Sequence, residues 1–111
     1  MSLLYQDPSM SHDEATLLLA SGVDTKVSAG LISIGLNEGD RTWAESTCLK
    51  YLTSGTESVA ASAVTALGHI ARRHGKLDKE VVLPALETVK QKYPSLEGII
   101  ADTLDDIDVF T

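Results

Sequence analysis

The stretch GHIARRHG, residues 68–75, holds the side chains of this sequence that most resemble a reactive group, namely two histidines and two arginines. Arginine binds phosphate and histidine transfers protons near neutral pH, so phosphate or acid–base chemistry is conceivable here. A catalytic site would also need a nucleophile, a second carboxylate or a metal ligand, and the nearest local partner is Asp78, beyond a glycine. The helix dipole also stabilises cations in a last helical turn. We therefore expect a structural role and no catalytic residue.

Cys48 is the single cysteine, and it lies among apolar residues, which is typical of a small core side chain. One cysteine excludes a disulfide framework, and the three histidines show no Cys/His spacing typical of zinc. We therefore expect no metal and no cofactor. No targeting signal or membrane-spanning run is recognisable, so a reduced, cytoplasmic setting without membrane contact is expected. Trp43 and Tyr51 either fill the core or anchor a partner.

Six helices are predicted to position these side chains, because Ala, Leu, Glu and Lys recur at helical spacing and no run alternates as a strand does. Glycines at 22, 39, 55 and 75 end the first four helices. Pro84 lies inside the fifth helix and is expected to kink it or confine it to its first turns. The residues expected to cap the other helix starts are Ser11, Asp24, Asp40, Asp78 and Ser95, while the fourth helix is the stretch 58–75 itself.

The apolar positions repeat with a period near 37 residues, which indicates three helical hairpins of one kind. Hairpins at this period are typical of a solenoid, in which each unit stacks on its neighbours. The aligned positions are Leu31, Leu67 and Leu104, then Ile34, Ile70 and Ile107 for the second helices, and Leu17, Leu52 and Val89 for the first helices.

The sequence VAASAVTALGHIA, residues 59–71, resembles the second helix of a HEAT-type repeat. LGHIARRHGKLD, VLPALE and LDDI are similar to one subgroup of short bacterial HEAT-like proteins. The resemblance implies an all-α fold, an α-α superhelix or HEAT-like solenoid of about three antiparallel hairpins. It also accommodates Pro84, since first helices of HEAT-type repeats often carry a proline kink. We expect one such domain over residues 11–111, preceded by a flexible segment, residues 1–10.

The charge of −7 is laid out unevenly, and residues 97–111 contain five carboxylates but no lysine or arginine. Such a segment argues against binding nucleic acid and leaves a basic protein partner open. Four of the carboxylates, Asp102, Asp105, Asp106 and Asp108, crowd one helix, where like charges cost a few tenths of a kcal/mol per pair. Two offsets stay open: Arg72 or Arg73 on the neighbouring helix, or a basic partner laid across the row Ser33, His69 and Asp106.

The sequence therefore predicts a non-enzymatic protein-binding module. The resemblance suggests an immunity protein of an interbacterial system such as contact-dependent growth inhibition, which blocks the active site of a basic, nuclease-type toxin. An adaptor or regulatory subunit of a cellular enzyme is the alternative. The free protein is expected to be monomeric. The predicted partner-facing residues are Ser33, Thr65, His69, Asp102, Asp105, Asp106 and Asp108.

Overall fold

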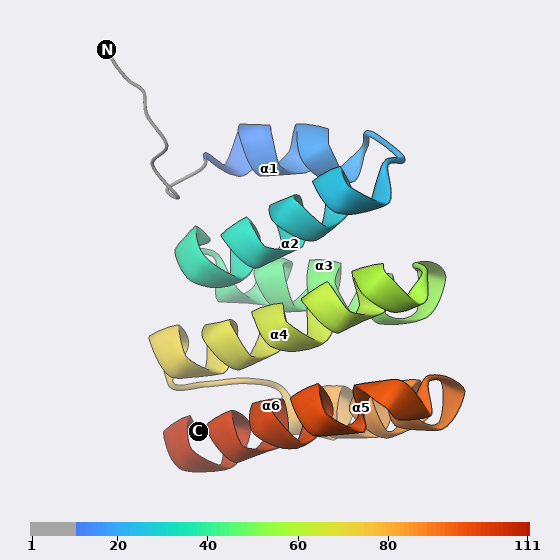
Figure 1. The fold of residues 1–111 in the computed structure, drawn as a ribbon. Helices are drawn as coiled ribbons and strands as arrows, with labels where there is room; N and C mark the ends of the chain where they lie inside the picture. Colours follow the sequence, from blue (N-terminus) through green and yellow to red (C-terminus); the bar gives the residue numbers. More distant parts are fainter. Residues whose placement is uncertain (1–10) are drawn as a thin grey trace.

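The structure, a computed structural model, describes residues 11–111, so the flexible segment predicted for residues 1–10 lies outside the described residues. Within the described part the chain forms six α-helices and no strand, which confirms the all-α prediction (Figure 1). In chain order these elements are α1 (His12–Leu19), α2 (Asp24–Asn37), α3 (Arg41–Ser54), α4 (Glu57–His74), α5 (Lys79–Lys92), the 3₁₀ turn η1 (Pro94–Leu96) and α6 (Glu97–Phe110).

The helices stack along one direction, and successive helices run in opposite directions (Figure 1). The second helix of each pair, α2, α4 and α6, lies beside the next, so that α4 contacts α2 on one side and α6 on the other. α3 and α5 lie behind this layer, and α1 covers the remaining side of α2. The result is a compact globule with extents of 43 × 28 × 21 Å.

The core is centred on α4, because this helix touches helices on three of its sides. Its apolar positions predicted to face inward, Val59, Ala63, Leu67 and Ile70, are all buried. Its other buried positions are mainly alanines and a glycine, whose short side chains let the neighbouring helices approach closely. α4 therefore has apolar residues spread around most of its circumference, as a central helix requires.

Gly35 is the point of closest approach between α2 and α4. A Cβ atom added at Gly35 would lie 2.9 Å from both the Cα and the carbonyl oxygen of Ala66, so no side chain fits there. Gly68 lies on the other side of α4, where an added Cβ atom would lie 3.2–3.3 Å from side-chain oxygens of Thr103 and Asp106 of α6. Gly35 and Gly68 thus both stand where α4 meets a neighbouring helix closely.

Two predicted caps are confirmed. Ser11 forms a capping box with Glu14, and the Asp40 carboxylate accepts a hydrogen bond from the Trp43 amide at 3.1 Å. Gly75, predicted to end α4, adopts the left-handed conformation there, with a φ of 62°.

Of the other predicted N-caps, one is confirmed in position only and two are wrong. Asp24 is the first residue of α2 rather than its cap, and its carboxylate accepts a hydrogen bond from the Thr56 hydroxyl at 2.7 Å. Asp78 occupies the N-cap position of α5, as predicted, although its side chain makes no capping bond. Ser95 lies in η1, and its hydroxyl donates to Glu57. In the first and last of these cases a partner distant in sequence competes for the side chain that a local pattern assigns to capping.

Three further expectations need correction. Leu104, predicted to face the core, is 39% exposed, while Thr103 is buried and its hydroxyl donates to the Val64 carbonyl at 3.1 Å. Leu17 is 72% exposed, whereas Ala15 of the same helix is buried. Pro84 does not confine α5 to its first turns, since the helix continues to Lys92.

We predict that Leu67→Asp unfolds the protein. Leu67 has no exposed surface in the middle of α4, so the carboxylate would be buried without a partner at an expected loss of about 3 kcal/mol or more. Ser58→Asp, on the exposed side of the same helix, should change the stability by less than about 0.5 kcal/mol. Urea unfolding followed by circular dichroism measures both. A Leu67→Asp protein as stable as the parent would refute the orientation of α4.

Two glycine-to-alanine substitutions test the close contact between α2 and α4. Gly35→Ala should destabilise by about 1–3 kcal/mol, because the added methyl group meets the backbone of Ala66 and overpacks the α2–α4 contact. Gly98→Ala, in α6 with no atom within 4 Å of the new Cβ, should stabilise by about 0.5 kcal/mol through helix propensity. Melting temperatures of the two variants should move in opposite directions. A shift of both in the same direction would contradict the packing described for Gly35.

Candidate partner-binding surface

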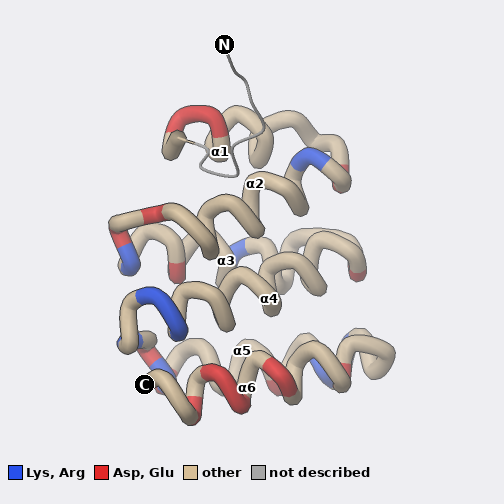
Figure 2. Tube along the Cα trace, turned by 60° about the vertical axis from the view of Figure 1, so that its left-hand side comes forward, with Lys and Arg blue, Asp and Glu red and all other residues tan. Residues whose placement is uncertain are grey.

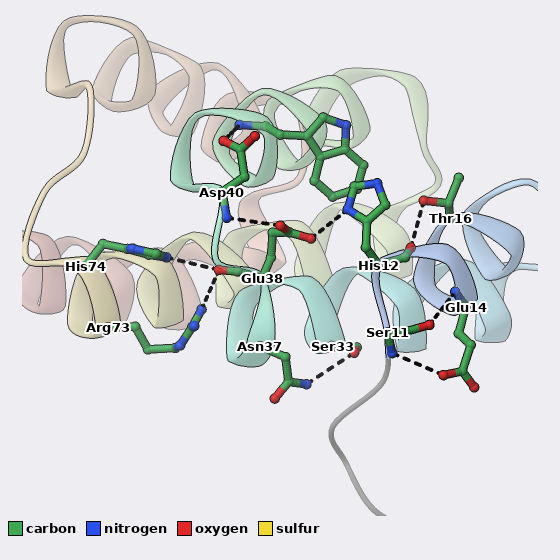
Figure 3. A network of polar contacts seen from close by, with 11 residues as sticks. Ser11, His12, Glu14, Thr16, Ser33, Asn37, Glu38, Asp40, Arg73 and His74 are labelled. Carbon is green, nitrogen blue, oxygen red and sulfur yellow. Dashed lines mark hydrogen bonds and ion pairs between the residues drawn. The ribbon is translucent and has the colours of Figure 1, made fainter.

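The basic end of α4 is used to hold the end of α2. Arg73 Nη1 donates to the Gly35 carbonyl at 3.2 Å and to the Glu38 carbonyl at 3.0 Å, and His74 Nε2 lies 3.2 Å from the same Glu38 oxygen (Figure 3). Carbonyls at the end of a helix lack partners within the helix, so these contacts satisfy them. Arg73 and His74 therefore have a structural role, but they act by binding the end of α2, whereas the prediction rested on the dipole of their own helix.

Glu38 joins three parts of the chain. Its carboxylate lies 2.8 Å from Nδ1 of His12 and accepts a hydrogen bond from the Asp40 amide at 3.0 Å, while its carbonyl meets Arg73 and His74 of α4 (Figure 3). The His12 ring in turn lies 4.1 Å from the Trp43 ring, between centroids. Sequence reasoning missed both His12 and Glu38, because each acts through contacts distant in sequence and neither belongs to a periodic pattern.

Beside Glu38 the surface between α1 and α2 is hollowed by a pocket of about 260 Å³. Its walls are Ser11, His12, Ala15, Ser33, Ile34, Asn37, Glu38 and Gly39. Ser33 is buried and accepts a hydrogen bond from Asn37 Nδ2 at 3.3 Å. The predicted row Ser33, His69 and Asp106 is therefore wrong at Ser33, which lies on the α1 side of α2, away from α4. The repeat shift fails here because Ser33 lines the pocket between α1 and α2.

Asp106 faces α4 and forms an ion pair with Arg72, with 3.1 Å between Nη2 and Oδ2. Arg72 thus offsets the charge of Asp106, which is one of the two possibilities that the sequence left open. It does so for this carboxylate alone. His69 is partly buried one turn before Arg72. Burial lowers the pKa of His69, the charge of Arg72 lowers it further and Asp106 opposes both, so His69 is mainly neutral at neutral pH.

The other predicted carboxylates, Asp102, Asp105 and Asp108, are exposed on α6. Among residues 11–111 none of the three forms an ion pair or a side-chain hydrogen bond. Figure 2 shows acidic residues following one another along α6, whereas the tube of α4 is uncharged between Glu57 at its start and its basic end. Thr65 and His69 of α4 are partly buried in the layer that α2, α4 and α6 share. The structure brings Thr65, His69 and the carboxylates onto adjacent helices of one layer.

The side chains that could support catalysis are either bound to backbone carbonyls or buried. Cys48 has no exposed surface, and burial, with a smaller effect of Glu45, raises the pKa of its thiol to about 12, so the reactive thiolate is disfavoured. Within residues 11–111 no group of three His, Cys, Asp or Glu residues could hold a metal ion.

No helix of the described chain is long and apolar enough to cross a membrane. Trp43 and Tyr51 are partly buried against the core.

No family model matches this chain, and no curated protein matches it either. A chain in the crystal structure of a CDI complex from Cupriavidus taiwanensis LMG 19424 is similar to this chain over nearly the whole length. The two chains are 28% identical, the match covers 98% of each, and the TM-score is 0.79. Six helices, their order and their stacking are thus similar, from end to end, to those of one chain of a CDI complex.

Proposed function

We propose that this chain is the immunity protein of a contact-dependent growth inhibition (CDI) system, a non-enzymatic protein that binds a toxin and blocks it. The observation that carries the proposal is the match to a chain of a CDI complex over 98% of both chains. A complex of this kind pairs a toxin with its immunity protein. The immunity role fits this chain better than the toxin role because Cys48 is buried, and Arg73 and His74 are bound to backbone carbonyls.

The charge of the chain supports a basic toxin of the nuclease type. A nuclease must attract phosphate, so its active site is positive, and a protein with a net charge of −7 is attracted to the same region. Asp102, Asp105 and Asp108 are free to take the positions that substrate phosphates would occupy, which would exclude the substrate. Thr65, His69 and Asp106 belong to the same proposed surface, and Ser33 is left out because it is buried.

The proposal includes a HEAT-like solenoid fold and a cytoplasmic location. The two layers of helices, with α2, α4 and α6 stacked in order, support a HEAT-like solenoid of three hairpins forming one domain over residues 11–111. In such a fold the second helices present a continuous surface to a partner. An immunity protein of this kind acts in the cytoplasm as a monomer until it meets its toxin.

The direct test uses the purified toxin domain encoded beside this gene. We expect it to bind this chain in a one-to-one complex and to lose its activity on RNA or DNA when the chain is added in equal amount. Calorimetry measures the stoichiometry, and cleavage of a labelled substrate measures inhibition. A neighbouring gene without a toxin domain, or a toxin domain that stays active and unbound, would refute the immunity role.

The carboxylate contribution is tested by charge removal. Asp102→Asn combined with Asp105→Asn should leave the melting temperature unchanged or slightly higher, because neither side chain has a partner and repulsion within α6 falls. Association with the toxin domain should slow by about 3- to 10-fold at low salt and depend less on salt, since charges at an interface rim mainly steer encounter. Stopped-flow mixing measures the association rate.

Two controls define this result. Asp13→Asn combined with Glu80→Gln removes the same charge from exposed positions on α1 and α5, and should change association by less than about twofold. Asp106→Asn should instead lower stability slightly, by less than about 1 kcal/mol, because it breaks the half-exposed pair with Arg72. Equal slowing by both double variants would mean that net charge, and not α6, attracts the toxin.

A further inference from the structure

Two adjacent helices carry a long surface without a charged residue. Residues 27–37 of α2 and 58–71 of α4 contain no Asp, Glu, Lys or Arg, although 23% of the whole chain is charged. The outward sides of both segments still reach the surface, so burial alone does not explain the lack of charge. The exposed or partly exposed members are Ser28, Ala29, Ile32, Leu36 and Asn37 on α2, and Ser58, Ala61, Ser62, Thr65 and His69 on α4.

This uncharged surface is continuous across the two helices. The missing side chain at Gly35 lets α2 approach the backbone of α4 at Ala66, which brings their outward sides close together. Figure 2 shows both helices uncharged between their ends, with the acidic residues of α6 along the neighbouring edge of the layer. The ion pair of Arg72 with Asp106 lies at the boundary between the two regions.

A centre without charges beside a charged edge is the arrangement found in protein interfaces. The buried centre of an interface is depleted of charged side chains, because desolvating them is costly, and the rim is polar. Residues at the centre mainly set the dissociation rate, whereas rim charges mainly set the association rate. Leu36 is 40% exposed on this surface, and covering its exposed apolar area would stabilise a complex.

We propose that the outward side of α2 and α4 is the centre of the toxin-binding surface, with Leu36 and Ile32 as its apolar anchor and the α6 carboxylates as its rim. This inference rests on the proposed function. The occupant is a protein face with apolar side chains at its centre and lysines or arginines on the side that meets α6. A second copy of this chain would bring further carboxylates to the rim rather than the positive charges that complement Asp102 and Asp105, so a basic partner fits better.

Two leucines of nearly equal exposure provide a matched test. Leu36 on α2 is 40% exposed and Leu83 on α5 is 38% exposed. Leu36→Glu should speed dissociation of the purified toxin domain encoded beside this gene by about tenfold or more, because it places a charge in the dry centre of the complex. Leu83→Glu adds the same charge away from the surface and should change dissociation by less than about twofold. Surface plasmon resonance measures both rates.

The direction in which the association rate changes distinguishes residues at the centre of the surface from residues at its rim. An added carboxylate attracts a basic toxin, so Leu36→Glu should not slow association, unlike the loss of Asp102 and Asp105. Leu36→Ser, which adds no charge, should still speed dissociation, and melting temperatures near that of the parent show that both variants are folded.

Three results would overturn the inference. Equal dissociation of the Leu36→Glu and Leu83→Glu proteins would remove α2 from the interface while leaving the immunity role intact. A parent protein that fails to bind the toxin domain would refute the proposed function and this inference together. Sedimentation of the parent as a dimer that Leu36→Glu separates would assign the surface to a second copy of this chain.

Discussion

The close contact of α4 with the helices on either side of it is the constraint on which the rest of the structure depends. Gly35 meets the backbone at Ala66, and Gly68 meets Thr103, so α2 and α6 both approach α4 where it has little side-chain volume. Contacts of this kind admit few alternative registers, because a larger side chain at either point would separate the helices. They fix α2, α4 and α6 in one layer, and that layer brings residues from three distant segments to a common surface.

The carboxylates of the chain divide into those the fold uses and those it leaves free. Glu45 is buried, where it accepts from Arg41 Nη1 at 2.8 Å and from the Asp78 amide at 3.0 Å, and so ties α3 to the start of α5. The Glu38 carboxylate similarly connects the end of α2 with His12 of α1 and with the Asp40 amide before α3. Buried or bridging carboxylates of this kind hold the ends of helices in place. The acidic residues on the outer side of α6 have no such task, which makes them available for function.

Periodicity predicted the helices well because each helix must bury one apolar side, and Leu67 and Ile70 leave a clear pattern. It failed at Thr103 and Leu104, since a threonine can be buried once its hydroxyl reaches a carbonyl of another helix, a partner that no local pattern reveals. The same limit hid Glu38 and misplaced Ser33. Repeat alignment assumes that every hairpin packs alike, yet α5 and α6 touch each other much less than the helices of the two earlier pairs do.

In the proposed role as inhibitor of a nuclease-type toxin, free carboxylates beside an uncharged surface would meet two opposing requirements. Attraction to a basic site favours many negative charges, but each charge buried in the final complex must be desolvated. Placing the charges on α6 and the apolar side chains on α2 would separate the two requirements, because the carboxylates would keep contact with water while they attract the toxin. Thr65 and His69 on α4 lie between these regions, and a neutral His69 can be covered without the desolvation cost of a charge.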